Sequence, residues 1–133
     1  MAGTVAYLDS SAFVKLVVAE DESAALVRAL ERWPQRAAAA LLRTEALRAL
    51  RRSGNQRSIP MARRMLRRIH LIQIDDRVLD RAGELEPTEL RSLDAIHVAA
   101  ALELGADLGV VLAYDLGLKA AAEASGLEVA SPS

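Results

Sequence analysis

The sequence of 133 residues contains no cysteine, few aromatic residues and only two lysines beside fifteen arginines. The lack of cysteine excludes a disulfide scaffold and a metal site with thiolate ligands. No apolar run approaches the roughly 20 residues that cross a bilayer, and no basic segment followed by an apolar one indicates a signal peptide. We therefore expect a cytoplasmic protein without membrane contact, whose residues 1–133 form a single domain.

The net charge of −1 conceals a strongly basic segment at residues 43–68, which carries a charge of +8 while the rest of the chain carries −9. The segment has one acid, Glu45, and its nine arginines are at positions 43, 48, 51, 52, 57, 63, 64, 67 and 68. This density is typical of a surface that contacts phosphate. Arginines on a solvated helix face or at a protein interface give the same pattern, so charge alone leaves all three open.

Short β-like runs alternate with helical stretches along the chain. Strands are expected at 4–8, 71–74, 108–113 and 127–129, and helices at 12–18, 21–33, 41–53, 59–70, 77–86, 92–104 and 116–124. Residues 37–40 fit either element, Ser10 and Ser11 are suited to capping a helix, and residues 130–133 resemble a tail. The alternation predicts an α/β fold, a three-layer α/β/α sandwich with a central, mostly parallel sheet.

Four acidic residues occupy positions that indicate a ligand-binding or catalytic site. Asp9 and Asp115 each follow an expected strand, and the carboxyl ends of parallel strands meet at the edge where such sheets bind ligands. Glu45 and Asp94 lie in the first turns of expected helices, and Asp94 has apolar neighbours on both sides. An unpaired carboxylate in such surroundings costs several kcal/mol, so it requires a partner.

Each of these acids also has a purely structural explanation. Asp9 and Asp115 could cap the helices that follow them, Asp94 could interact with its helix dipole, and Glu45 could pair with Arg48 or Arg52. The carboxylates could instead converge, provided that a hard divalent cation such as Mg²⁺ or Mn²⁺ offsets their repulsion. His97, three residues after Asp94, fits helix packing or a place near that acid.

Four segments of the chain resemble the PIN-domain pattern, and in order and spacing they resemble the VapC toxins of bacterial toxin–antitoxin systems. They are YLDSSAFVKL at residues 7–16, TE at 44–45, LDAIHVAAA at 93–101 and YDLGL at 114–118. The resemblance extends over almost the whole chain. It implies a metal-dependent endoribonuclease that binds Mg²⁺ or Mn²⁺ and is inhibited by a cognate VapB-type antitoxin, and it implies a homodimer.

Carried over by position, the resemblance makes Asp9, Glu45, Asp94 and Asp115 the acidic, catalytic and metal-binding quartet, with Ser11 as the hydroxyl that supports the pocket. Arg48 and Arg52 would contact RNA or the antitoxin. The chain departs from the family at Ala113, where a Thr or Ser often precedes the last acid. We therefore expect weaker hydrogen-bonding support there, which leaves open whether Asp115 binds the metal directly or acts through water.

Two other functions fit the same residues. A receiver-like phosphoacceptor domain also has acids at strand ends around Mg²⁺, but this chain has no paired acids after its first strand and no suitable late lysine. A non-catalytic module could use the exposed arginines and leucines to dock a partner helix. The few aromatic residues predict that any RNA specificity depends on shape and hydrogen bonds more than on base stacking.

Overall fold

A computed structural model describes residues 3–133, and its centre is a five-stranded parallel sheet in the order β3-β2-β1-β4-β5. The strands are β1 (Val5–Leu8), β2 (Gln35–Ala39), β3 (His70–Ile72), β4 (Leu108–Leu112) and β5 (Val129–Ala130). The helices are α1 (Ser10–Val17), α2 (Ser23–Leu30), α3 (Leu42–Arg52), α4 (Ile59–Leu66), α5 (Asp76–Glu84), α6 (Ser92–Leu102) and α7 (Leu116–Ala124), with short 3₁₀ turns η1 (Gln56–Ser58) and η2 (Gly105–Asp107).

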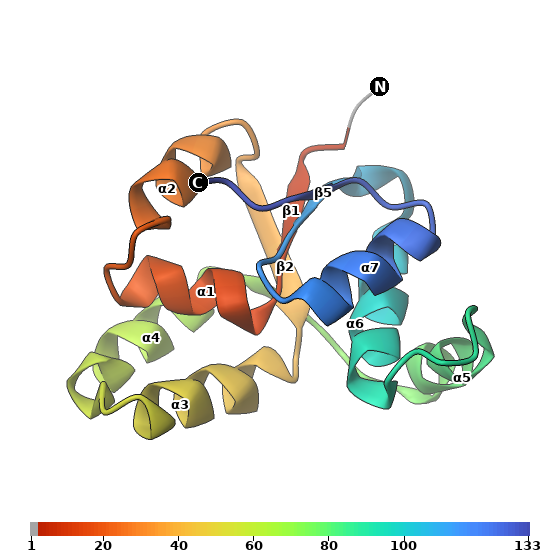
Figure 1. Ribbon diagram of the computed structural model, residues 1–133, viewed down its shortest axis with the longest axis horizontal. Coiled ribbons are helices and arrows are strands. Elements are labelled where there is room, and N and C mark those ends of the chain that lie inside the picture. The colour runs from red at the N-terminus through yellow and green to blue at the C-terminus, as the bar shows by residue number, and fades with distance from the viewer. Residues whose placement is uncertain (1–2) are drawn as a thin grey trace.

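Helices cover both faces of this sheet, as the sequence predicts for strands linked by helical crossovers. Figure 1 shows α1 to α4 on one side and α5 to α7 on the other. Each side encloses its own cluster of buried apolar side chains, one contacting α1 to α4 and one contacting α5 to α7. The expected three-layer α/β/α arrangement is therefore confirmed.

The central strand β1 has apolar side chains on both faces because it lies between two helical layers. Tyr7 packs toward α5 to α7, whereas Ala6 and Leu8 pack toward α1 to α4, and all three are fully buried. The neighbouring strand β2 ends in buried alanines, whose small side chains let the helices approach the sheet closely. The buried strand predicted at 4–8 is confirmed for Val5–Leu8, whereas Thr4 is exposed and lies outside the strand.

Most predicted elements are confirmed, with shifts at their ends. The ambiguous residues 37–40 belong to β2, the helix expected at 59–70 ends at Leu66, and the strand expected at 71–74 is β3 at His70–Ile72. The helix at 21–33 begins two residues later, at Ser23, and ends at Leu30. Local composition places such boundaries poorly because pairing with a neighbouring strand decides where a strand begins.

Two local predictions were wrong. Asp9, and not Ser10 or Ser11, is the N-cap of α1, because its Oδ1 accepts a hydrogen bond of 2.9 Å from the Ala12 N–H. The expected tail at 130–133 is attached to the fold, since the Tyr114 hydroxyl donates to the Pro132 carbonyl at 2.6 Å.

In the described residues, no helix has the length and apolar character needed to cross a membrane.

Candidate active site

The carboxyl edge of the sheet opens into a pocket of about 690 Å³, to which all four predicted acids contribute. We call this the acidic pocket and define it by Asp9, Glu45, Asp94 and Asp115. They come from the end of β1, from α3, from the first turn of α6 and from the position that precedes α7. The fold therefore brings together residues that lie up to 106 positions apart in the sequence.

Asp9 is the most deeply buried of these acids, with 3% of its surface exposed. Burial raises its pKa from 3.8 to about 6, although hydrogen bonds from Ser11 and from the Ala12 N–H lower it. Asp9 thus caps α1 and lines the acidic pocket at once, which reconciles the structural explanation with the functional one. A carboxylate held in this way gains strongly from a nearby cation.

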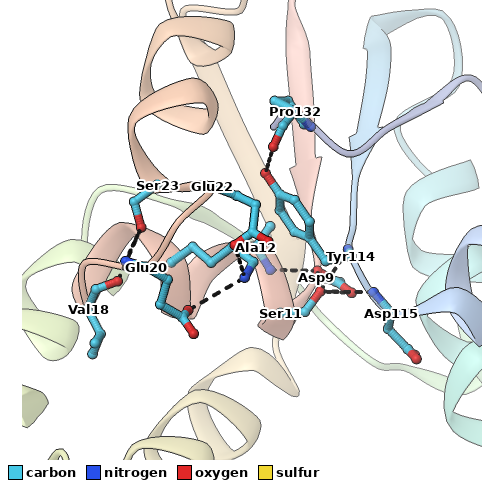
Figure 2. Close-up of polar contacts among 11 residues, drawn as sticks. Asp9, Ser11, Ala12, Val18, Glu20, Glu22, Ser23, Tyr114, Asp115 and Pro132 are labelled. Carbon is cyan, nitrogen blue, oxygen red and sulfur yellow. Dashed lines mark hydrogen bonds and ion pairs between the residues drawn. The ribbon is translucent and has the colours of Figure 1, made fainter.

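Ser11 connects Asp9 to the loop that carries Asp115, as Figure 2 shows. Its single hydroxyl hydrogen is shared between the two carboxylate oxygens of Asp9, at 2.7 and 2.8 Å, and its oxygen accepts from the Tyr114 and Asp115 N–H groups, at 2.9 and 3.3 Å. Loop support in this chain therefore comes from α1. Ala113 is fully buried in the core, and its carbonyl accepts from the Ser131 hydroxyl.

Asp94 and Asp115 approach each other across the N-terminal turn of α7. Desolvation, followed by the charge of Asp115, raises the pKa of Asp94. Gly117 lies between them, and a Cβ at this position would be 3.0 Å from Asp94 Oδ2 and 3.8 Å from Asp115 Oδ2. The glycine therefore keeps the floor of the acidic pocket open. Asp115 makes no side-chain cap on α7, so the capping explanation fails for this acid.

Glu45 points into the fold, away from the arginines that the sequence offered as partners. Its Oε1 lies 2.9 Å from the His97 Nε2, and among the described residues it has no ion pair with Arg48 or Arg52. His97 is 4% exposed, and its other ring nitrogen, Nδ1, lies 2.7 Å from the Tyr7 hydroxyl. His97 is buried, and it also lines the acidic pocket with Asp94, so the expected place near that acid is confirmed, while its contact with Glu45 was not predicted.

Two further residues of the site escaped sequence reasoning. Tyr7 was placed in a buried strand and in a segment that resembles the family, but no role was predicted for its hydroxyl, which contacts His97. Arg91 lines the acidic pocket and its charge lowers the pKa of Asp94, yet it lies outside the basic segment at 43–68. The available signal was its spacing. Arg91 is three residues before Asp94, and residues three apart at the start of a helix lie on the same face.

The donors of the acidic pocket suit a hard divalent cation by their chemistry, because all four are carboxylates. Among residues 3–133, no group of three or more acidic or histidine side chains is already close enough to hold a metal ion. Asp9 is turned toward Ser11 and Glu45 toward His97. Cation binding therefore requires the carboxylates to move closer together, and for Asp9 and Glu45 this movement competes with the hydrogen bonds that hold them.

The basic segment forms a separate surface beside this pocket. All nine of its arginines are exposed, and within the described part of the chain none of them forms an ion pair with an acid. Between α3 and α4 the surface is hollowed into a groove of about 440 Å³. We call it the basic groove, and it is lined by Arg43, Thr44, Leu47, Arg63, Leu66, Arg67 and Leu71.

Comparison with known proteins agrees with this geometry. The family model described as PIN domain matches residues 6–124. The chain is 49% identical to Ribonuclease VapC46 of Mycobacterium tuberculosis H37Rv, with 96% of this chain and 97% of that protein covered. It is 32% identical to Ribonuclease VapC47 of M. tuberculosis CDC 1551, with 95% and 96% covered.

Solved structures share the fold. The crystal structure of M. tuberculosis VapC20, described as a sarcin-ricin loop cleaving toxin, matches with a TM-score of 0.71 at 15% identity, covering 87% of this chain and 94% of that one. A toxin–antitoxin complex from Klebsiella pneumoniae matches with a TM-score of 0.69 at 22% identity, covering 96% and 98%.

The match to a family model over residues 6–124 excludes the alternative of a receiver-like phosphoacceptor domain. The chain belongs to the PIN-domain family and, within it, to the VapC group.

Proposed function

We propose that this chain is a divalent-metal-dependent endoribonuclease toxin that hydrolyses RNA phosphodiester bonds in the acidic pocket. The observation that carries the proposal is the meeting of four carboxylates, from four separate segments, in one pocket of a chain that is 49% identical to a ribonuclease of the VapC group. We place the activity in the cytoplasm because the RNA substrate is found there.

Asp9 and Asp94 are the residues we assign to hold Mg²⁺ or Mn²⁺, with Asp115 acting directly or through water. The raised pKa values of Asp9 and Asp94 support this assignment, because a cation relieves the cost of ionising desolvated acids. When bound, the ion supplies Lewis-acid polarisation of the phosphate and activation of water. Glu45 either joins the ligands or orients the attacking water and accepts its proton.

The remaining residues position these groups and the RNA. Ser11 fixes the carboxylate of Asp9 and the loop before Asp115 through its four hydrogen-bond contacts. Arg91 supplies positive charge at the wall of the pocket. The exposed arginines, Arg48 and Arg52 among them, attract the RNA backbone toward carboxylates that would otherwise repel phosphate.

A VapB-type antitoxin is the protein partner we propose, in keeping with the VapC group. Two large apolar side chains are exposed near the acidic pocket: Leu93 at 56%, which lines it, and Leu116 at 77%, which follows Asp115. Apolar surface of this kind is usual where a partner binds. The homodimer implied by the resemblance stays a prediction, which sedimentation of the free chain tests.

The test is cleavage of a mixed RNA pool by purified protein with Mn²⁺, with Mg²⁺ and with EDTA. We expect metal-dependent cleavage by the wild type and none by Asp94→Asn. Asp80→Asn is the matched control, since Asp80 is exposed on α5 and does not line the acidic pocket. Full activity of Asp94→Asn would contradict the proposed site. Intact RNA in every condition, with a VapB-type partner still bound, would favour the protein-binding module.

A further inference from the structure

A chain of hydrogen bonds links β2, β1, α6 and α3 and ends at Glu45. It begins at the Ala39 N–H of β2, which donates to the Tyr7 hydroxyl at 3.2 Å. The Tyr7 hydroxyl lies 2.7 Å from His97 Nδ1, and His97 Nε2 lies 2.9 Å from Glu45 Oε1. Tyr7 is fully buried and His97 is 4% exposed, so the protein itself supplies the partners of both side chains.

The donors and acceptors along this chain fix where its protons are. A backbone N–H can only donate, so the Tyr7 oxygen accepts from Ala39. Burial raises the pKa of Tyr7 above its usual range, so the hydroxyl keeps its own proton. That proton has one acceptor within reach, His97 Nδ1.

The ring nitrogen that accepts from Tyr7 cannot carry a proton, so the proton of the His97 ring is on Nε2. The Nε2–H group then donates to Glu45 Oε1. The reverse arrangement, with a proton on Nδ1, would leave the Tyr7 hydroxyl proton without an acceptor in the core. Within the described residues, no buried side-chain nitrogen or oxygen lacks a hydrogen-bond partner. An unpaired Tyr7 hydroxyl proton would be the one exception, which argues against a proton on Nδ1.

We propose that Tyr7 and His97 are positioning residues that hold Glu45 Oε1 and direct its second carboxylate oxygen, Oε2, to the metal ion or to the attacking water. The proposal rests on the proposed function, because it gives Glu45 a role in the acidic pocket. Among the described residues Oε2 makes no hydrogen bond, whereas Oε1 is occupied by His97.

A fixed donor is useful here because the other three carboxylates repel Glu45. Without His97, the Glu45 side chain could rotate toward the exposed arginines of its own helix, such as Arg48, which lie on the solvent side of α3. His97 is anchored by Tyr7, and Tyr7 by β2, so the orientation of Glu45 is tied to the rigid centre of the sheet. Losing an outer partner of this kind typically costs about 10- to 100-fold in metal affinity or activity.

The experiment measures Mn²⁺ affinity by the paramagnetic resonance signal of free Mn²⁺, together with RNA cleavage as a function of Mn²⁺ concentration. Its variants are Tyr7→Phe, which keeps the ring, His97→Phe, which removes both nitrogens, and His97→Gln, which restores a donor near Nε2. Val98→Ala is the stability-matched control, because Val98 is the next residue of α6, 1% exposed, and faces the core.

We expect His97→Phe to bind Mn²⁺ about 10- to 100-fold more weakly. We expect His97→Gln to recover most of that loss, Tyr7→Phe to fall between them, and Val98→Ala to bind as the wild type does. Nitrogen-resolved NMR of the wild-type ring should place the proton on His97 Nε2. Wild-type Mn²⁺ affinity together with wild-type RNA cleavage in His97→Phe, equal loss in the Gln and Phe variants, or a proton on Nδ1 would overturn the proposal.

These readouts separate the positioning role from the proposed function. If the wild type binds Mn²⁺ and the variants weaken binding as expected, but no RNA is cleaved, the ribonuclease assignment fails and the positioning of Glu45 stands. If RNA is cleaved and His97→Phe leaves both Mn²⁺ affinity and the Mn²⁺ dependence of cleavage unchanged, the positioning role fails and the ribonuclease assignment stands.

Discussion

Replacing Asp9 by Asn should make the protein more stable while removing its activity. Asp9 is 3% exposed, and burial raises the pKa of its carboxyl from 3.8 to about 6. Ionisation of the folded protein is therefore unfavourable relative to the unfolded chain. An asparagine keeps an oxygen that can accept the Ala12 N–H, so the cap of α1 survives while the charge is removed.

The sign and the size follow from this rise in pKa. Between pH 4 and pH 6 the folded state holds a proton that the unfolded state has lost, so the free energy of unfolding falls as the pH rises through that range. Each unit of pKa corresponds to about 1.4 kcal/mol, so the rise from 3.8 to about 6 corresponds to about 3 kcal/mol of lost stability at pH 7.5. Asp9→Asn should regain about 1–3 kcal/mol there and gain little below pH 4.

Urea unfolding in EDTA, followed by the fluorescence of the single tryptophan, Trp33, measures this difference at pH 7.5 and pH 4. Asp9→Ala is the informative comparison, because it removes the charge and the helix cap together. It should be about 1 kcal/mol less stable than Asp9→Asn at both pH values. An Asp9→Asn protein no more stable than the wild type at pH 7.5 would refute the reasoning about desolvation.

Three further outcomes are expected. Gly117→Ala should weaken Mn²⁺ binding about tenfold, measured by calorimetry, because its Cβ would lie 3.0 Å from Asp94 Oδ2. Urea unfolding should detect no loss of stability, since alanine favours a helix. Unchanged affinity would contradict the role given to the glycine. Mn²⁺ should raise the melting temperature more at pH 7.5 than at pH 5, because protonation of Asp9 competes with the cation below a pKa of about 6; an equal rise at both pH values would count against Asp9 as a ligand. Arg63→Ala with Arg67→Ala should weaken RNA binding and flatten its salt dependence by about 0.7 in log–log slope per lost phosphate contact, with Mn²⁺ affinity unchanged; filter binding over a salt series would show an unaltered slope if the basic groove does not hold RNA.

The positions of the four acids could be predicted because the rules that place them are local. Asp9 directly follows a buried apolar run, and Asp115 follows a second one, so both had to reach the carboxyl edge of a parallel sheet. Glu45 and Asp94 could be assigned to the first turns of helices from composition alone. The orientation of each side chain could not be predicted from the sequence, because it depends on hydrogen-bond partners that are distant in the chain.

Glu45 and His97 illustrate that limit. The sequence offers Glu45 two arginines on its own helix, yet its partner is a histidine 52 residues away, oriented by a tyrosine 90 residues from that histidine. A strand that packs on two helical layers hides a functional hydroxyl such as that of Tyr7 among apolar residues. For Ser11 the resemblance implied support of the pocket, whereas its local position indicated only a helix cap. The contacts of its hydroxyl with the loop before Asp115 join residues 103 and 104 positions apart.

The central claim is that the four carboxylates of the acidic pocket hold a divalent cation. Anomalous diffraction from crystals grown with Mn²⁺ tests it most directly. We predict an anomalous peak in the acidic pocket, with oxygens of Asp9 and Asp94 at about 2.1 Å, and its loss in Asp94→Asn crystals. A peak elsewhere on the protein, or an empty pocket at Mn²⁺ concentrations that support RNA cleavage, would contradict the account.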